Sequence, residues 1–135
     1  MFKKIHVFRI YPDLELLAEI TNYCQTHKIF SGIILGIIGS LNNASLAYIR
    51  ELPGKYESFE YEGPLEIVAA QGSIALKDSS IVPHIHIHIS SPAGCYGGHL
   101  NAASVFSTAE VTIGELDYQL KRALDSYTGL NELVD

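Results

Sequence analysis

Hydrophobic and polar residues alternate along several stretches of this chain, and alternate residues of a β-strand point to opposite faces of a sheet. Turn-forming residues separate these stretches, and Leu41, Asn42 and Asn43 offer the turn of a hairpin. The pattern predicts about seven strands, at 4–10, 31–39, 44–51, 56–61, 65–76, 82–90 and 104–113.

Two segments have the spacing of helices instead. Leu14, Leu17, Ile20 and Cys24 form one hydrophobic stripe and predict a helix over 12–28, with its proline in the first turn. A second, short helix is expected at 116–125. Because strands outnumber helices and do not alternate with them, the fold class is α+β: a single domain over 1–135, in which helices pack on a mixed or largely antiparallel sheet.

The charge and composition limit the classes of function. The chain has 15 acidic residues against 9 lysines and arginines, a net charge of -6, so it lacks the positive excess that binding to bare DNA needs. No hydrophobic run is long enough to span a membrane, and the N-terminus does not resemble a secretory signal. With only two cysteines, which form no Cys-x-x-Cys pair, we expect a cytoplasmic protein without a disulfide scaffold.

The chemistry is concentrated between residues 83 and 100, which read PHIHIHISSPAGCYGGHL and hold four of the six histidines. On a strand, His84, His86 and His88 line one face while the isoleucines between them enter the core. Alternate residues lie about 6.6–6.8 Å apart along a strand, so one ion can be held by His84 with His86 or by His86 with His88.

His99 can supply a third imidazole, because Gly97 and Gly98 permit a tight turn that returns it toward the strand. Three neutral imidazoles suit a divalent metal, zinc first, and leave one position open for water or a small ligand. Glu110 is a weak candidate for a catalytic base or for orienting a ligand imidazole, and an ordinary surface role explains it equally well.

Two other interpretations of the histidines stay open. The imidazoles can be packing groups at a sheet or subunit surface without metal, in a regulatory module that contacts DNA or a transcription partner. Whether the chain is an enzyme is also open, with metal-dependent hydrolase or lyase chemistry compatible with such a site. The sequence contains no phosphate-binding loop, dinucleotide fingerprint or nucleophile elbow.

Across nearly its whole length the sequence resembles the plants and prokaryotes conserved (PPC) domain family, some plant members of which join this domain to a basic AT-hook. The matching stretches are SGIILGIIGSLNNASLAYI, YEGPLEIVAAQGSIAL, the histidine segment, STAEVTI and the tail LKRALDSYTGLNEL.

This resemblance implies a seven-stranded, largely antiparallel sheet with helices and a homotrimeric assembly. It also implies a metal held by a His-x-His strand and a Gly-Gly-His turn, which correspond here to His84, His86 and His99. This chain differs by carrying His88 and a loop about one residue shorter, so His88 is an alternative to His84. No Arg-Gly-Arg-Pro hook is present, and DNA binding by this chain alone is therefore not expected.

Overall fold

The computed structural model describes residues 1–134, most of which lie in strands. Within these residues there is one helix and one seven-stranded sheet. The elements are β1 (Phe2–Ile10), α1 (Leu16–His27), β2 (Gly32–Glu51), β3 (Lys55–Lys77), β4 (Ser80–Ser91), β5 (Gly94–Leu116), β6 (Lys121–Leu124) and β7 (Asn131–Val134). No helix in this range has the length and hydrophobicity that a membrane span requires.

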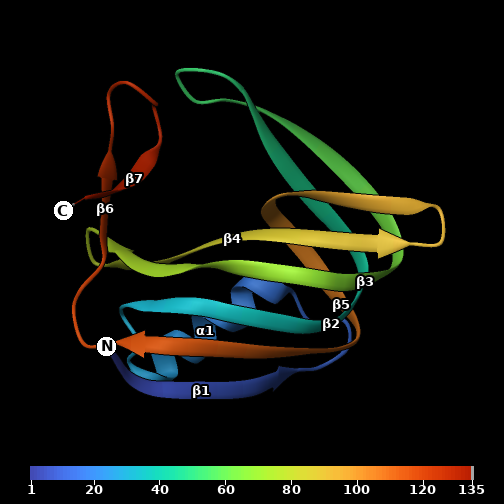
Figure 1. Ribbon diagram of the computed structural model, residues 1–135, viewed down its shortest axis with the longest axis horizontal. Coiled ribbons are helices and arrows are strands. Elements are labelled where there is room, and N and C mark those ends of the chain that lie inside the picture. Colours follow the sequence, from blue (N-terminus) through green and yellow to red (C-terminus); the bar gives the residue numbers. More distant parts are fainter. Residues whose placement is uncertain (135) are drawn as a thin grey trace.

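Four long strands pair in a closed circuit, since β2 pairs with β3, β3 with β4, β4 with β5 and β5 with β2. β1 extends this circuit along the edge of β5, and α1 packs against β4 and β5 (Figure 1). Among the described strands, only the pairing of β3 with β6 is parallel. The prediction of a largely antiparallel sheet is confirmed.

The core lies inside the circuit and beneath α1. Ile85, Ile87 and Ile89 of β4 are buried there, whereas the histidines between them are half-buried or exposed. Leu16, Ile20 and Cys24 form the buried face of α1, so that Ile20 and Cys24 of the expected stripe are buried, whereas Leu14 precedes the helix and is exposed. The helix is shorter than predicted, because Asp13 has a left-handed φ of 68° and the Glu15 carboxylate caps the first turn by accepting a hydrogen bond from the Ala18 amide.

The predicted hairpin at 41–43 was wrong. β2 runs on through these residues with an irregularity in its register, and the Asn42 amide bonds to Asp13, Ser104 and the Val105 carbonyl instead of forming a turn. In the same way, the predicted strands at 56–61 and 65–76 are two parts of β3.

The predicted helix at 116–125 was also wrong. Its first residue ends β5, and residues 121–124 form β6, which pairs with the end of β3 and with β7. The Leu76 amide donates to the Leu120 carbonyl at 3.0 Å. Pairing with an open strand edge has therefore overridden the helical preference of a short segment. The structure has one helix where two were expected, and the total of seven strands is reached by different strands.

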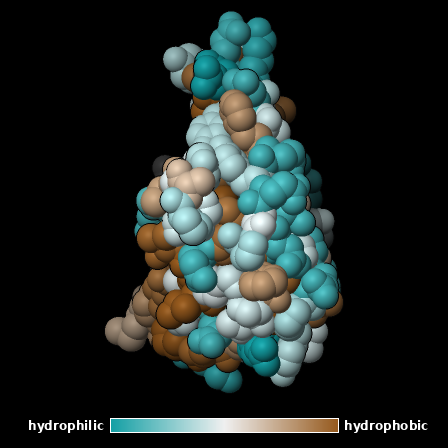
Figure 2. Space-filling view, turned by 90° about the vertical axis from the view of Figure 1, so that its right-hand side faces the viewer, coloured by the Kyte–Doolittle hydropathy of each residue, from teal (hydrophilic) through white to brown (hydrophobic). Residues whose placement is uncertain are grey.

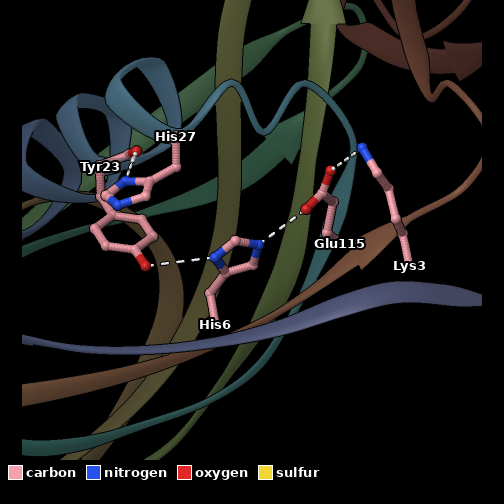
Figure 3. A network of polar contacts seen from close by, with 5 residues as sticks. All are labelled: Lys3, His6, Tyr23, His27 and Glu115. Atoms are coloured by element: carbon pink, nitrogen blue, oxygen red, sulfur yellow. Dashed lines mark hydrogen bonds and ion pairs between the residues drawn. The ribbon is translucent and has the colours of Figure 1, made fainter.

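A polar network joins β1, β5 and α1 at the edge of the sheet (Figure 3). The His6 imidazole, 6% exposed, lies 2.9 Å through Nε2 from a Glu115 oxygen and 3.4 Å through Nδ1 from the Tyr23 hydroxyl. Lys3 donates to the other Glu115 oxygen at 3.0 Å. Hydrogen bonding to His6, aided by Lys3, lowers the pKa of the Glu115 carboxyl from its ordinary value.

We predict that Glu115→Gln lowers the free energy of unfolding at neutral pH by about 1–3 kcal/mol, because a buried, charge-assisted hydrogen bond is lost. A carboxyl with a lowered pKa contributes stability above its ordinary pKa of 4.5 and loses that contribution as the pH falls through the folded-state value. Urea unfolding of parent and variant should therefore converge once the pH falls below the folded-state pKa of Glu115. Asp117→Asn, at the exposed pair with the Met1 amine, is the control and should change stability by about 0–1 kcal/mol. A difference for Glu115→Gln that does not shrink toward the acid end of the titration would contradict this assignment.

Candidate metal centre

The outward face of β4 carries His84, His86 and His88, and the strands on both sides fix where each one lies. β4 pairs with β3 along its length, so that Ser73 lies opposite His84, and its second half pairs with β5. In this register His86 lies directly opposite His99. Because directly opposed residues on one face of an antiparallel pair are close neighbours, the pairing brings two imidazoles together from the two strands of one hairpin.

Three imidazoles form a compact cluster. His84, His86 and His99 each place a ring nitrogen so that these three atoms all lie within 4.8 Å of one another. Their ring centroids are separated by 5.2 Å, 5.0 Å and 5.6 Å, without parallel stacking. His88 is exposed, lies opposite Gly97, and is not part of this cluster.

Gly97 and Gly98 do not form the turn that the sequence predicts. Both are paired residues of β5, and the chain reverses earlier, between Ser91 and Gly94. The two glycines instead let Tyr48 approach β5 closely. A Cβ at Gly98 would lie 3.2 Å from the Tyr48 ring, and the Tyr48 hydroxyl donates a hydrogen bond to the Gly97 carbonyl. The register between β4 and β5, not a tight turn, therefore places His99 in the cluster.

Burial keeps two of the imidazoles in the form that can bind a cation. Desolvation, with smaller contributions from the charges of Arg122, His99 and His86, lowers the pKa of His84 to about 4. Desolvation also lowers the pKa of His99. Both rings are thus neutral near pH 7 and retain a lone pair, as a metal ligand requires.

Arg122 of β6 lies against this cluster and was not anticipated. Its side chain is 8% exposed, and its guanidinium donates to the Asn131 carbonyl, to Ser73 Oγ and to Nδ1 of His84 at 3.0 Å, 2.9 Å and 3.2 Å. The remaining guanidinium nitrogen, Nε, has no hydrogen-bond partner. It is the one buried side-chain nitrogen or oxygen in residues 1–134 that lacks a hydrogen bond.

The C-terminal hairpin of β6 and β7 stands beside the tip of the β2–β3 hairpin, with β4 passing below both (Figure 1). The Gly54 amide donates to the Thr128 carbonyl at 2.8 Å across this contact. Gly129 has a left-handed φ of 69°, and a Cβ there would lie 2.8 Å from the side chain of Pro53. The contact therefore requires glycine at position 129.

Between these segments lies a cavity of about 390 Å³ whose walls include His84, His99 and Arg122. A second hollow, of about 380 Å³, reaches His86. The volumes suit a small molecule. The two hollows share the residues Tyr56, His84, His99, Leu130 and Glu132.

The acidic residue at the cavity is Glu132, not Glu110. Glu110 is exposed and lies eleven residues further along β5 than His99, paired with Arg9 and Ile38. Glu132 is the sole acid among the residues that line either hollow. The structure thus brings together the three histidines but leaves Glu110 on another part of the sheet.

The comparisons with known proteins agree with this architecture. The profile of the Plants and Prokaryotes Conserved domain, abbreviated PCC or PPC, matches residues 1–117. The chain belongs to this family. The confirmed resemblance covers β1 to β5 and thus all three clustered histidines, whereas the PPC profile ends before Arg122 and Glu132.

Two solved structures of similar proteins cover all of this chain. A metal-containing protein from Archaeoglobus fulgidus is 29% identical, with a TM-score of 0.93 over 96% of that protein. A PPC protein from Pyrococcus horikoshii is 26% identical, with a TM-score of 0.90 over 94% of its length. Both alignments extend through β6 and β7, so the C-terminal hairpin is part of the shared fold.

Among curated proteins, the bifunctional protein GlmU of a Synechococcus strain is 28% identical over 133 residues. The alignment takes in 96% of this chain, and the chain spans about a fifth of that relative's length. A PPC-like segment therefore also occurs as a part of much larger proteins.

We predict that Gly129→Ala detaches the C-terminal hairpin from the β2–β3 tip, because the added methyl group meets Pro53 and the left-handed φ becomes strained. Hydrogen exchange of the Gly54 amide, observed by NMR, should accelerate at least about tenfold. Gly36→Ala is the matched control, since a Cβ there meets no atom within 4 Å. Unchanged protection of Gly54 in Gly129→Ala would show that this contact does not hold the hairpin.

Proposed function

We propose that this PPC-domain protein binds one divalent metal ion per chain, zinc in the first instance, through His84, His86 and His99. The observation that carries the proposal is the cluster of three ring nitrogens within 4.8 Å of one another. Tetrahedral zinc with Zn–N bonds of 2.0–2.1 Å separates its ligands by about 3.3 Å, which small side-chain rotations can reach from this starting arrangement. The lowered pKa values of His84 and His99 favour the neutral rings that zinc requires.

Three protein ligands leave a coordination position for a small molecule from the adjoining cavity. A bound zinc ion would act there as a Lewis acid or lower the pKa of a water molecule. The chain's own residues would define the remaining walls, with Tyr56 and Leu130 forming hydrophobic parts of them, and Arg122 and Glu132 supplying charge. Hydrolase and lyase reactions are both compatible with these groups, and neither is assigned.

The similar protein from Archaeoglobus fulgidus supports the proposal, because it is described as metal-containing and matches this chain over its full length. The hollow of about 390 Å³ beside the histidines also supports it, because this volume suits a small ligand.

The test is the metal content of the purified, tag-free chain after incubation with zinc and desalting, measured by plasma mass spectrometry. We predict close to one zinc per chain in the parent and less than about a tenth of that in the His86→Ala, His99→Ala double variant, because a single imidazole cannot retain the ion. His88→Ala is the control and should keep its zinc. If His88→Ala loses its zinc while His84→Ala retains it, His88 and not His84 is the ligand. If the parent binds no zinc, the proposal is refuted.

We also propose that three copies of the chain associate as a homotrimer. Hydrophobic side chains remain exposed on the outward face of neighbouring strands, among them Ile5, Val7, Leu35, Ile38 and Val68. Figure 2 shows hydrophobic side chains gathered in the lower part of the molecule, below a hydrophilic upper end. A hydrophobic surface of this kind is typical of contacts between subunits.

Sedimentation velocity should accordingly give a mass three times the 14.8 kDa of the chain. Ile38→Glu, which places a charge on this face, should raise the dissociation constant of the assembly at least about tenfold. Leu124→Glu is matched to it, since the two side chains are 72% and 70% exposed and Leu124 lies in β6. A monomeric parent, or equal dissociation by both variants, would contradict the proposed interface.

The remaining expectations fit the same function. Cys24 and Cys95 are free thiols, which supports a cytoplasmic location. Residues 1–135 are proposed to act as one domain, because the segment beyond the matched range supplies Arg122 and Glu132 to the cavity of the earlier strands. With a net charge of -6 and no AT-hook, contact with DNA is not part of the proposed function.

A further inference from the structure

Arg122 donates a hydrogen bond to the lone pair of His84 that a metal ion would need. A guanidinium only donates hydrogen bonds, so Nδ1 of His84 accepts the bond from Nη2 of Arg122 at 3.2 Å. A neutral imidazole has one accepting nitrogen, and Nε2 of His84 therefore carries the proton in this arrangement. Whichever nitrogen binds the metal, coordination by His84 requires that this contact with Arg122 be given up.

Loss of that contact leaves the guanidinium with unused donors. Nε has no partner already, and Nη2 would retain only Ser73. Nε and Nη2 lie on the same edge of the guanidinium, and this edge forms the fork that matches the two oxygens of a carboxylate. Arg122 is 92% buried, and buried donors without an acceptor destabilise a structure because they have lost their hydrogen bonds to water.

The charge balance of the cavity favours the same kind of ligand. Imidazoles that ligate a metal are neutral donors, and the charges of Arg122 and Glu132 offset each other. A divalent cation then leaves the cavity with two uncompensated positive charges. Since no other acid lines either hollow, a ligand with a single negative charge would compensate part of this excess.

We infer that Arg122 is the anion-binding residue of this site, and that the site takes a small carboxylate, held by the fork of the guanidinium, beside the open position of the metal. The inference rests on the proposed metal centre and specifies its ligand. Metal binding withdraws the lone pair of His84 from Arg122 and so releases the guanidinium for the carboxylate. The two ligands therefore bind with positive cooperativity, each raising the affinity for the other.

The experiment uses glycolate, a small 2-hydroxy carboxylate, and glycolamide, a neutral molecule of the same size. Both are titrated into the zinc-loaded full-length chain by calorimetry. The parent should bind glycolate at least about tenfold more tightly than glycolamide, because charge-assisted hydrogen bonds to the guanidinium are made only with the carboxylate. Equal binding of the two molecules by the zinc-loaded parent would overturn the inference.

Variants at the two charged positions should change glycolate affinity in opposite directions. Arg122→Gln should weaken it at least about tenfold, and Arg122→Lys should restore part of the loss, because it returns the charge without the fork. Glu132→Gln should strengthen it, since a nearby negative charge is removed. A general disturbance of the C-terminal hairpin would weaken glycolate binding in all of these variants, and that result would refute a specific role for Arg122.

Two further measurements separate this inference from the metal proposal. Zinc affinity, measured by competition with a chelating dye without carboxylate, should be at least as high in Arg122→Gln as in the parent, because a competitor for His84 is removed. Weaker zinc binding in Arg122→Gln would overturn the release of Arg122 by the metal. Asp117→Asn, at a position that lines neither hollow, is the control for a change of charge and should leave glycolate affinity within about twofold.

If the parent retains no zinc, the metal centre itself fails, and the inference fails with it. If the parent retains zinc but Arg122→Gln binds glycolate as tightly as the parent does, only the role of Arg122 is refuted.

Discussion

The register of β4 between β3 and β5 is the constraint on which this molecule depends. Because successive residues of a strand point to opposite faces, a shift by one residue would turn Ile85, Ile87 and Ile89 outward and bury the histidines. Pairing on both edges, together with the fully packed isoleucines, fixes one register. The same hydrophobic packing that stabilises the fold thereby holds His86 opposite His99.

The C-terminal hairpin adds the charged residues to a site whose imidazoles come from the central strands. β6 pairs with the end of β3, and this pairing sets Arg122 against His84 and Ser73. The family profile matches the chain only as far as residue 117, whereas the similar solved structures align with the whole chain. The β-circuit and the hairpin thus contribute different parts of one cavity.

Residues 84–89 show what could be predicted from the sequence. Strict alternation of histidine and isoleucine specifies a strand with one buried face, and the structure agrees. His99 joins the cluster as predicted, but the predicted route was wrong: Gly97 and Gly98 were interpreted as a turn, whereas glycine also serves where a neighbouring ring approaches a strand closely. Local sequence does not say which of these two uses applies.

Arg122 and Glu132 could not be found in the sequence for a related reason. In a helix over 116–125 Arg122 would have been an ordinary solvated residue, and only the long-range pairing of β6 with β3 makes it a buried one. Glu110 was selected for its nearness in sequence to the histidine segment, but β5 is long and extended and carries Glu110 away from it. Distances within one strand follow from the sequence, whereas contacts between β6, β7 and the remainder of the sheet do not.

The way in which β6 and β7 are attached has a consequence for kinetics. Each strand has four residues, and β6 is registered with β3 at only two positions, Leu76 with Lys121 and Lys77 with Arg122. Short, peripheral pairings of this kind open locally far more often than the strands of a packed core. Substitutions at the contact of this hairpin with the β2–β3 tip would then change how fast β6 and β7 exchange with solvent while the histidine cluster stays intact.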